Sequence, residues 1–345
     1  MPLSFDETYA ALHDAAVGRV VERDVVAVSG PDALTYLQGQ CTQDLSSMAG
    51  GDARRSLLLT PQGKVVALVR VVASDSSRFL VEVEHGWGEQ VLERLRRFKL
   101  RVKADLELVS WKSAEVRGPL SQRAIEGWRH EEGGGGSPGG GRTSLDEDLA
   151  VLVERFVVLV DDRFGRGVDV LAPDVALPPG VPEGDPAAFE AARIEAGLPA
   201  MGSELDDNVI PQEAGIVGET VSFTKGCYTG QELVARLDAR GNRVPRVLRG
   251  IVVPGYGAGT LGSPALPPVG SELRAGERVV GTLTSVGWSP RLGGAVALAY
   301  VRREVEPPAE VRLLPPASSA GRDGAASAGA GEPAGLTAEV RALPI

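Results

Sequence analysis

Three strand-like segments joined by two short turns constrain the fold of this chain more than any other feature. The first runs from Ser56 to Thr60, the second is a Val/Leu run from Lys64 to Ala73, and the third alternates from Phe79 to Glu84. Pro61-Gln62-Gly63 and Asp75-Ser76-Ser77 are typical turn sequences. Strands joined by such short connections pair antiparallel. The sequence therefore predicts an antiparallel sheet and not the regular βαβ alternation of a Rossmann domain.

Helical segments flank this sheet. One helix is predicted to open at Ser29-Gly30-Pro31-Asp32, with Ser29 as its N-cap. Another starts near Trp87, where apolar residues recur at helical spacing. A third begins at Asp185-Pro186 and ends at Gly197, and the residues from Gln231 onward also suit a helix.

The end of the helix that starts near Trp87 is strongly basic. Arg94, Arg96, Arg97, Lys99, Arg101 and Lys103 lie within ten residues. This pattern is typical of a solvated helix C-terminus, where positive charge is favourable. It is also compatible with a docking surface for an anionic ligand tail.

The character of the sequence changes after Arg246. Short Val/Leu/Gly segments separated by Gly/Pro turns indicate an all-β module with a barrel-like architecture. Within it, residues 315–335 are almost wholly Pro, Ala, Ser and Gly, which predicts a disordered insertion. Val311–Leu314 and Leu336–Val340 are candidate strands on either side of it. A second Gly-rich stretch, Glu131 to Arg142, is expected to be a surface loop.

Composition narrows the class of protein. The formal net charge of the 345 residues is -10, which argues against a general nucleic-acid partner and against an anionic membrane surface. We see no signal peptide and no apolar run of the roughly 18 residues needed to span a bilayer, so a cytoplasmic location is expected. Two distant cysteines and three scattered histidines predict neither a disulfide framework nor a metal site.

The segment with the clearest chemical potential is Lys225-Gly226-Cys227-Tyr228-Thr229-Gly230-Gln231-Glu232. Cys227 lies just before a predicted helix, where the helix dipole and Lys225 both favour the thiolate, a nucleophile and metal ligand. A small buried cysteine is the alternative, and the residues alone do not decide between the two. Cys41 has no such context and is expected to be a buried apolar residue.

This segment resembles the signature of the YgfZ family, relatives of the glycine cleavage T-protein (aminomethyltransferase). Agreement extends from about Asp24 to about Val301. Four further stretches carry it: Leu37-Gln38-Gly39-Gln40-Cys41-Thr42-Gln43-Asp44-Leu45, Leu58-Leu59-Thr60-Pro61-Gln62-Gly63-Lys64, Arg193-Ile194-Glu195-Ala196-Gly197-Leu198-Pro199 and Ile210-Pro211-Gln212-Glu213.

The resemblance implies an α+β fold in a three-lobed ring, with two ferredoxin-like lobes and a C-terminal β-barrel. The expected domains are 1–50 with 112–243, which forms the first folate-binding lobe, then 51–111, and then 244–345 with the insertion at about 315–335. The implied function is tetrahydrofolate binding in iron–sulfur cluster assembly or repair, including for tRNA-modifying cluster enzymes. The implied partners are folate and iron–sulfur client proteins, with no direct nucleic acid and no membrane.

The resemblance also implies site residues. Glu195 matches the family glutamate that pairs with the pterin ring, and one carboxylate can accept both adjacent pterin N–H groups. Arg193 is either a neighbour in that site or a surface ion pair. Cys227 matches the family's functional cysteine, with Lys225 as its electrostatic activator. The remaining folate-site residues that we predict are Tyr228, Gln231 and Arg236.

Arginines follow the signature at intervals. From Lys225 to Arg249 there are six basic and two acidic residues, a local charge of +4. The run is either a site for the glutamate tail of folate, or for another anionic partner, or a solvated face.

One departure from the T-protein pattern bears on the reaction. T-proteins carry an Asn-Ala pair followed by a catalytic aspartate, whereas Glu82 to Trp87 occupies that region here and contains no Asp. Folate-dependent aminomethyl transfer or demethylation is therefore the alternative function and not the first expectation. A folate-binding module without catalysis is a third possibility.

Overall fold

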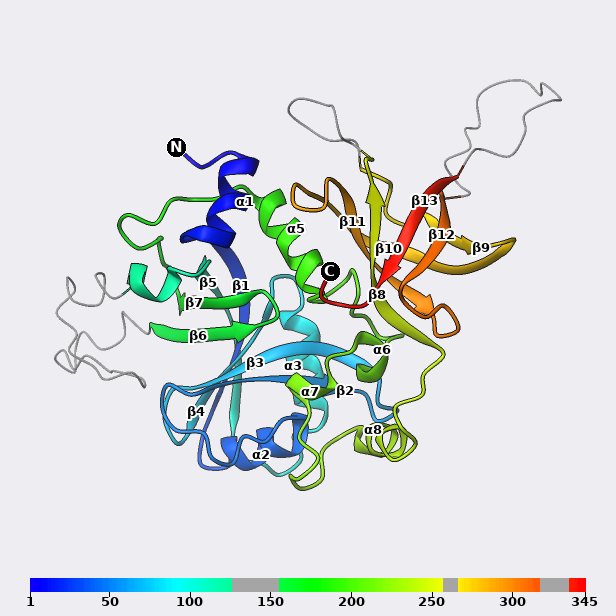
Figure 1. The fold of residues 1–345 in the computed structure, drawn as a ribbon. Helices are drawn as coiled ribbons and strands as arrows, with labels where there is room; N and C mark the ends of the chain where they lie inside the picture. The colour runs from blue at the N-terminus through cyan, green and yellow to red at the C-terminus, as the bar shows by residue number, and fades with distance from the viewer. Residues whose placement is uncertain (126–154, 257–265, 317–334) are drawn as a thin grey trace, which may run out of the picture. The chain divides into compact units, whose positions relative to one another are not determined.

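The computed structural model describes residues 1–125, 155–256, 266–316 and 335–345 (Figure 1). The chain forms two compact units, which we describe separately. Unit 1 comprises Met1–Asp185 and Leu205–Arg243, and unit 2 comprises Pro186–Glu204 and Val244–Ile345. The predicted Gly-rich loop from Glu131 to Arg142 and almost all of the predicted insertion at 315–335 lie outside the described residues. The subdivision of the first 243 residues into two lobes stays a prediction.

A seven-stranded antiparallel sheet forms the centre of unit 1 (Figure 1). The three strands predicted between Ser56 and Glu84 are confirmed at one end of the sheet, where they pair antiparallel. In sheet order the strands are β2 (Ala53–Leu59), β3 (Val65–Ala73), β4 (Arg78–Glu84), β1 (Val17–Ser29), β5 (Asp105–Arg117), β7 (Gly165–Ala172) and β6 (Phe156–Asp162).

The sheet curls into a half-barrel because strands that are not neighbours share one core. Buried apolar side chains from six of the seven strands form a single cluster: Val25, Val72, Leu80, Trp111, Val158 and Leu171. Arg70 on β3 also reaches Asp169 on β7, with Nη1 and Oδ2 2.5 Å apart, although three strands separate these two in the sheet. Burying apolar surface in this concave face gives the curled sheet its main stabilisation.

Helices complete unit 1. They are α1 (Phe5–Asp14), α2 (Ala33–Gln40), α3 (Gly88–Arg97), α6 (Pro211–Ala214), α7 (Val217–Thr220) and α8 (Gln231–Asp238). The predicted cap at Ser29 is wrong, because Ser29 is the last residue of β1 and α2 begins only at Ala33. The Asp32 carboxylate does not cap α2 either. It accepts the backbone N–H of Lys103, at 2.8 Å, and so ties the start of α2 to the chain that follows α3.

Unit 2 is a closed six-stranded barrel with one helix against it. Strand order is β10 (Arg278–Ser289), β11 (Gly294–Arg302), β8 (Arg246–Pro254), β13 (Leu336–Arg341), β12 (Ala309–Leu314) and β9 (Glu272–Ala275). The two candidate strands around residues 315–335 are confirmed as β12 and β13, which pair antiparallel. Helix α5 (Pro186–Ala196) lies directly on β10, since a Cβ added to Gly287 would be 3.1 Å from the Ala191 Cα.

The predicted fold class is therefore confirmed as α+β with a C-terminal β-barrel. Among the described residues, no helix is both long and apolar enough to cross a membrane.

Candidate functional site

The side chain of Lys225 organises the signature segment in unit 1. Its Nζ donates to three backbone carbonyl oxygens, those of Gln38 at 2.6 Å, Cys41 at 2.7 Å and Gln43 at 2.9 Å. An ammonium group has three donors, so these carbonyls use all of them. Thr229 adds a backbone hydrogen bond to the Gly39 carbonyl at 3.2 Å. The signature segment and the segment 37–45 are thus one structural cluster.

These contacts give Lys225 a structural role that the sequence did not predict. Its ammonium is directed at carbonyl oxygens, and burial lowers the pKa of Lys225 while Cys41 and Asp44 partly oppose the shift. The described residues provide no hydrogen bond between Lys225 and Cys227. The predicted activation of Cys227 by Lys225 stays a prediction, and it gains no support from these contacts.

Two glycines join the segment 58–64 to the same cluster. Gly230 has φ +85, and a Cβ built on it would lie 2.5 Å from the Thr60 carbonyl oxygen. Gly63 has φ +80, and its added Cβ would lie 2.8 Å from Leu233 Cβ at the start of α8. Only glycine accepts both the positive φ and the close approach. Three of the segments that carry the family resemblance therefore meet at the N-terminus of α8.

The two cysteines occupy opposite environments in this cluster. Cys227 is exposed on the loop, three residues before Gly230, the N-cap of α8. Cys41 is fully buried, as the sequence predicts. Burial raises the pKa of the Cys41 thiol to about 11, although Lys225 and Ser56 lower it in part. Cys227 is thus the thiol that a partner or a small molecule can reach.

Tyr228 and Gln231 belong to the interior of the cluster. Tyr228 is 7% exposed, and burial raises the pKa of its hydroxyl to about 12. The Lys225 Nζ lies 5.4 Å from the centre of the Tyr228 ring, within cation–π range. Gln231 Oε1 accepts the backbone N–H of Tyr228 at 3.2 Å. These contacts hold the loop, and a contact of either side chain with folate stays a prediction.

The arginine run after the signature is divided between the two units. Arg236 is exposed in the last turn of α8, in unit 1. Arg246 and Arg249 lie on β8, in unit 2. Arg246 stacks on Tyr300, 4.7 Å from the ring centre, and burial lowers the pKa of Arg249 while Glu306 opposes the shift. The arginines are close together in the sequence, but they belong to two different units.

Glu195, the predicted pterin partner, lies on α5 in unit 2. It is 5% exposed, and its Oε2 accepts Arg291 Nη2 at 2.9 Å. Arg291 is half exposed, with 51% of its side chain accessible. The Glu195 carboxylate is thus buried and held in an ion pair within its own unit. Its contact with a pterin stays a prediction.

Arg193, its neighbour on α5, takes part in a network of its own. The Arg193 guanidinium contacts Glu190 Oε1 at 2.6 Å, Glu204 Oε2 at 3.1 Å and Ser285 Oγ at 2.7 Å. The Glu204 side chain is fully buried and also accepts Ser285 Oγ. Arg193 does form ion pairs, and the one with Glu204 is buried and not on the surface. Its role in folate binding stays a prediction.

An ion-pair network that no sequence pattern indicated crosses the concave face of the sheet. It joins Arg19, Arg23, Arg70, Arg117, Glu82, Glu115 and Asp169. Burial opposes ionisation of Glu115, but Arg19 and Arg23 outweigh it and hold the pKa of Glu115 well below its ordinary value. In the sequence each residue is an ordinary charge on an alternating strand, so only the curl of the sheet reveals the network.

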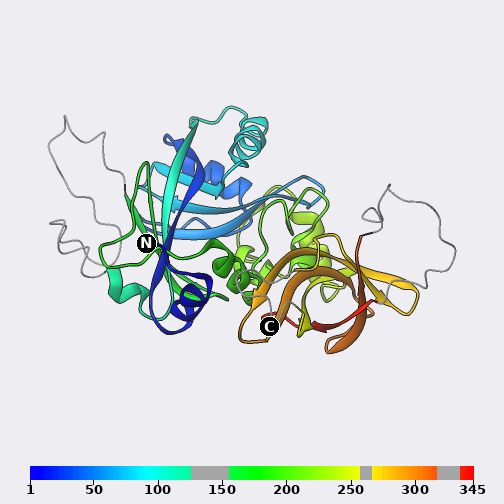
Figure 2. The same cartoon turned by 90° about the horizontal axis from the view of Figure 1, so that it is seen from above.

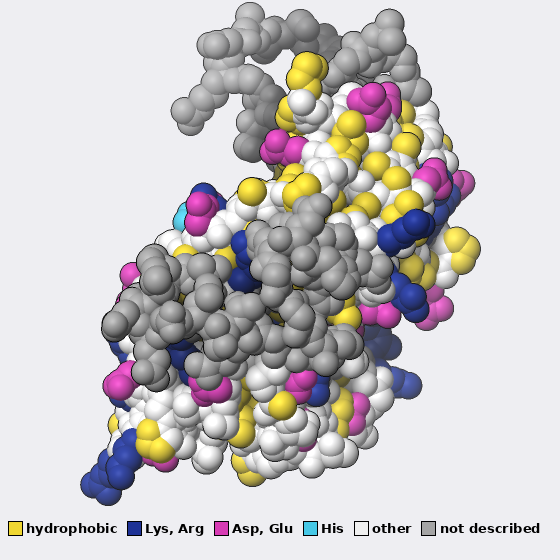
Figure 3. All heavy atoms as spheres, turned by 90° about the vertical axis from the view of Figure 1, so that its left-hand side faces the viewer, with side chains coloured by type: hydrophobic (Ala, Val, Ile, Leu, Met, Phe, Trp, Pro, Cys, Tyr) yellow, Lys and Arg dark blue, Asp and Glu magenta, His cyan; other side chains and the backbone are white. Residues whose placement is uncertain are grey.

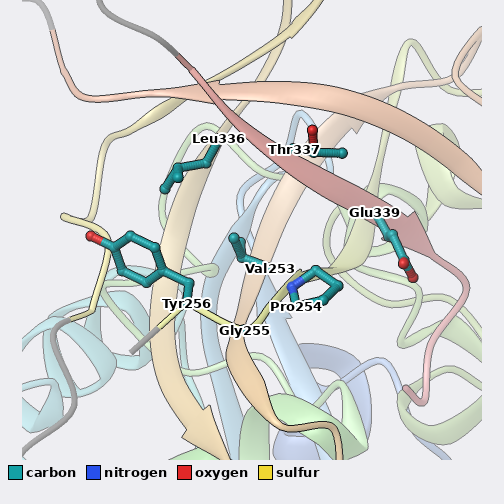
Figure 4. Close-up of a pocket in the computed structure, with 7 residues that line it drawn as sticks. All are labelled: Val253, Pro254, Gly255, Tyr256, Leu336, Thr337 and Glu339. Atoms are coloured by element: carbon teal, nitrogen blue, oxygen red, sulfur yellow. The ribbon is translucent and has the colours of Figure 1, made fainter. Parts of the chain in front are cut away.

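Cavities in the described part of the molecule include one in each unit. One, of about 530 Å³, lies in unit 1 between the two edge strands of the sheet and is lined by Gln43, Ala53, Arg54, Arg55, Asp161, Asp162, Arg163 and Glu219. Arg55 Nη1 is buried there without a hydrogen bond to a described residue, 3.6 Å from the carboxylates of Asp162 and Glu219. The other, of about 350 Å³, lies in unit 2. It is lined by the C-terminal end of β8 with the residues that follow it, and by β13 (Figure 4).

A carboxylate does lie beside the segment that lacks the T-protein aspartate, but it comes from β1. Asp24 Oδ2 accepts the backbone N–H groups of Gly86 and Gly88, both at 2.8 Å, and Oδ1 lies 3.0 Å from His85 Nδ1. Asp24 is 8% exposed and holds the turn before α3. Residue 24 is distant in sequence from residues 82–87, so no local motif could have found it.

Comparison with known proteins finds two matching family models and several relatives. The family model of the GCVT N-terminal domain matches residues 6–132, and that of the glycine cleavage T-protein C-terminal barrel domain matches residues 260–314. An aminomethyltransferase of Rubrobacter xylanophilus is 30% identical over 298 residues, which are 84% of this chain and 76% of that protein.

Two further relatives have other names. The tRNA-modifying protein YgfZ of Edwardsiella ictaluri is 31% identical over 223 residues, 63% of this chain and 65% of that protein. The mitochondrial iron-sulfur cluster assembly factor IBA57 homolog of Neurospora crassa is 27% identical over 263 residues, 71% of this chain and 56% of that protein. The glycine cleavage system aminomethyltransferase T from Bartonella henselae has a similar fold, with a TM-score of 0.71 at 17% identity, covering 99% of this chain and 90% of that one.

Proposed function

The chain belongs to the glycine cleavage T-protein superfamily, and from this premise we propose that it binds tetrahydrofolate and acts in the assembly or repair of iron–sulfur clusters. The relative named as an iron-sulfur cluster assembly factor and the relative named as a tRNA-modifying protein support this direction. Client iron–sulfur proteins, among them cluster enzymes that modify tRNA, and a cytoplasmic location are parts of the same proposal.

One observation carries the proposal: an exposed thiol on a fixed loop. Cys227 is accessible, whereas the residues on both sides of it are anchored through Lys225, Tyr228 and Thr229. A cysteine kept only for packing is normally buried, as Cys41 is in this chain. An accessible thiol on an anchored loop suits transient contact with a cluster, or with a protein that carries one, because its position is fixed before contact.

The test of this role is Cys227→Ser in cells that lack the chromosomal copy. We expect the activity of a [4Fe–4S] dehydratase to fall to the level of the deletion strain. The free energy of unfolding of the purified variant should stay within about 0.5 kcal/mol of the parent's, because the side chain is exposed. Cys41→Ser is the control for general loss of fold. It is expected to lower stability and protein level together. Full dehydratase activity in Cys227→Ser would remove the functional role of this cysteine.

Glu195 is the residue that we propose for the pterin ring. A buried carboxylate that accepts adjacent N–H groups suits a pterin. Tetrahydrofolate would supply a carrier for a one-carbon unit. The residues of this chain would bind and orient it.

Calorimetry tests the assignment with a matched pair of variants. Glu195→Gln is expected to weaken tetrahydrofolate binding by at least about tenfold, since loss of a charge-assisted pair costs about 1.4 kcal/mol or more. Arg291→Gln breaks the same Glu195–Arg291 ion pair from the other side and leaves the carboxylate in place. Equal losses in both variants would show that the ion pair and not a pterin contact is responsible.

Aminomethyl transfer on folate is the second candidate, favoured by the relative named aminomethyltransferase, of which this chain covers 76%. Against it stand the missing aspartate in residues 82–87 and the use of Asp24 by two backbone N–H groups and His85. Incubation with an aminomethylated lipoyl carrier and tetrahydrofolate distinguishes the two candidates. Methylenetetrahydrofolate formation at many turnovers per protein would favour the transferase.

A further inference from the structure

The end of α3 and the chain that follows it toward β5 form an exposed basic turn, which we define as residues 96–103. Arg94 to Lys103 contains six basic residues and no acidic one, in a chain with a net charge of -10. Arg94 turns inward, where its Nε donates to the Leu59 carbonyl and its Nη1 to Gln40 Oε1, both at 2.9 Å. The five cations of the basic turn remain, and Figure 2 shows α3, in cyan, standing at the outer edge of unit 1.

The favourable interaction of positive charge with a helix C-terminus explains only part of this charge. The interaction fades beyond the last turn of a helix, and α3 ends at Arg97. Lys99, Arg101 and Lys103 lie beyond that end. Their charges repel one another and gain nothing from the helix dipole.

The cations of the basic turn are not neutralised by any side chain in the described ranges. None of Arg96, Arg97, Lys99, Arg101 and Lys103 forms an ion pair with a described residue. The nearby acids flank the turn: Glu93 on α3, Asp105 on β5, and Asp32, whose carboxylate accepts the Lys103 backbone N–H. By contrast, acidic and basic side chains are interspersed over the described part of the face in Figure 3.

An apolar side chain stands at the centre of the basic turn. Leu100 is 80% exposed, the most exposed large hydrophobic residue in the described chain apart from Met1. Arg101, directly after it, has φ +56, an uncommon conformation for a residue other than glycine. This backbone reversal turns the chain where Leu100 projects, so exposure of Leu100 is a property of the fixed backbone.

The backbone of the basic turn is held in place. Asp32 N–H donates to the Lys103 carbonyl at 3.2 Å, and a Cβ on Gly30 would lie 2.5 Å from that same oxygen. Beneath the turn, the Arg94 guanidinium lies 4.1 Å from the centre of the Phe98 ring. A fixed turn loses little conformational entropy when a partner binds it.

We infer that the basic turn is a docking surface for a partner protein whose contact face is acidic around an apolar recess that receives Leu100. Charge complementarity selects the acidic rim, and Leu100 selects a protein over a nucleic acid, because phosphate backbones offer charge but no apolar recess. Burying one Leu side chain strengthens binding by about tenfold or more. The inference uses residues outside the Cys227 and Glu195 sites, so it stands or falls independently of the proposed function.

Fluorescence anisotropy on the full chain tests the inference with three probes of equal charge. They are an acidic peptide with one central leucine, the same peptide with serine in that place, and an oligouridylate. The parent is expected to bind the leucine peptide about tenfold more tightly than the serine peptide, and more tightly than the oligouridylate. In Leu100→Ser the difference between the two peptides should disappear.

Charge-reversal variants separate the basic turn from the general charge of the protein. The double variant Arg96→Glu with Arg97→Glu is expected to bind the leucine peptide at least about tenfold more weakly than the parent does. Arg302→Glu with Arg303→Glu, an exposed pair in unit 2, changes the net charge equally and should have little effect. Tighter binding of the oligouridylate, indifference to Leu100→Ser, or equal effects of the two double variants would each overturn the inference.

Discussion

A single ammonium group fixes the loop that carries Cys227. Lys225 binds carbonyl oxygens of three residues in the segment 38–43, and each would lose its charged donor if the lysine were replaced. Carbonyl groups left without donors in a part-buried site are costly. Lys225 therefore belongs to the fold as much as to the site.

Lys225→Met is expected to lower the free energy of unfolding by about 2 to 4 kcal/mol, because it removes three charge-assisted hydrogen bonds. Urea denaturation measures the change. Lys64→Met is the matched control, since the Lys64 ammonium makes no hydrogen bond to a described residue, and it should change stability by less than about 0.5 kcal/mol. Unchanged stability in Lys225→Met together with slower reaction of Cys227 with a thiol reagent would favour the activator role.

Gly230 and Gly241 separate backbone conformation from close packing. Both have positive φ, +85 and +74, but only Gly230 faces a neighbour, the Thr60 carbonyl, at 2.5 Å from an added Cβ. Gly241→Ala should cost about 1 kcal/mol for its conformation alone. Gly230→Ala should cost about 3 kcal/mol or more, because the segment 58–64 must also move. An equal decrease in Tm in the two variants would contradict the close packing of Gly230 against Thr60.

At the scale of elements, the curl of the sheet brings charged side chains into contact with one another. They come from β1, β3, β4, β5 and β7 and form ion pairs. Burial opposes ionisation of Asp169 as well, and Arg117 and Arg70 outweigh it and lower its pKa. Carboxyl groups with lowered pKa bind protons more tightly in the unfolded chain than in the folded one. Stability that these groups contribute is therefore present above the unfolded pKa and is lost as the pH falls through that value toward the folded pKa.

The expected consequence is loss of stability below about pH 5, with a slope of about 1.4 kcal/mol per pH unit for each such carboxyl group. Glu115→Gln should lower stability at neutral pH and make this acid slope shallower. Urea midpoints at a series of pH values measure both effects. Glu107→Gln is the control on the same strand, since Glu107 is exposed and forms no ion pair with a described residue, and its acid slope should stay close to the parent's.

Sequence patterns predicted the elements better than the contacts between them. Alternation and turn residues located β2, β3 and β4, and the strands on both sides of residues 315–335 were found in the same way. Family resemblance identified the segments that meet at α8. The Lys225 hydrogen bonds, the Asp24 contacts and the ion-pair network all join residues far apart in sequence, and such contacts depend on strand order and curl, which no local pattern contains.

At the scale of the whole molecule, the chain enters unit 2 twice. It contributes Pro186–Glu204 first, returns to unit 1 at Leu205, and enters again at Val244. Within this first segment Arg193 pairs with Glu204, and it also donates a hydrogen bond to Ser285 of β10, which belongs to the second segment. The integrity of unit 2 thus depends on a helix that is distant in sequence from its strands.

Arg193→Met is expected to loosen unit 2 selectively, because it leaves the fully buried Glu204 carboxylate without its charged partner. Hydrogen exchange should rise by at least about tenfold in α5, β10 and β11, and stay unchanged in β3 and β4. Arg278→Met removes an exposed ion pair with Glu304 in the same unit and should alter neither region. Uniform faster exchange in both units would contradict the selective effect.

The early position of α5 also sets an order of events during synthesis. A ribosome releases α5 long before β10 and β11, against which its apolar face packs. Unit 1 can fold meanwhile, but the barrel closes only after β13, close to the end of the chain, has emerged. In the nascent protein α5 therefore stays without its native cover until β10 and β11 have been synthesised, and this interval is when a chaperone or an aggregate would compete for it.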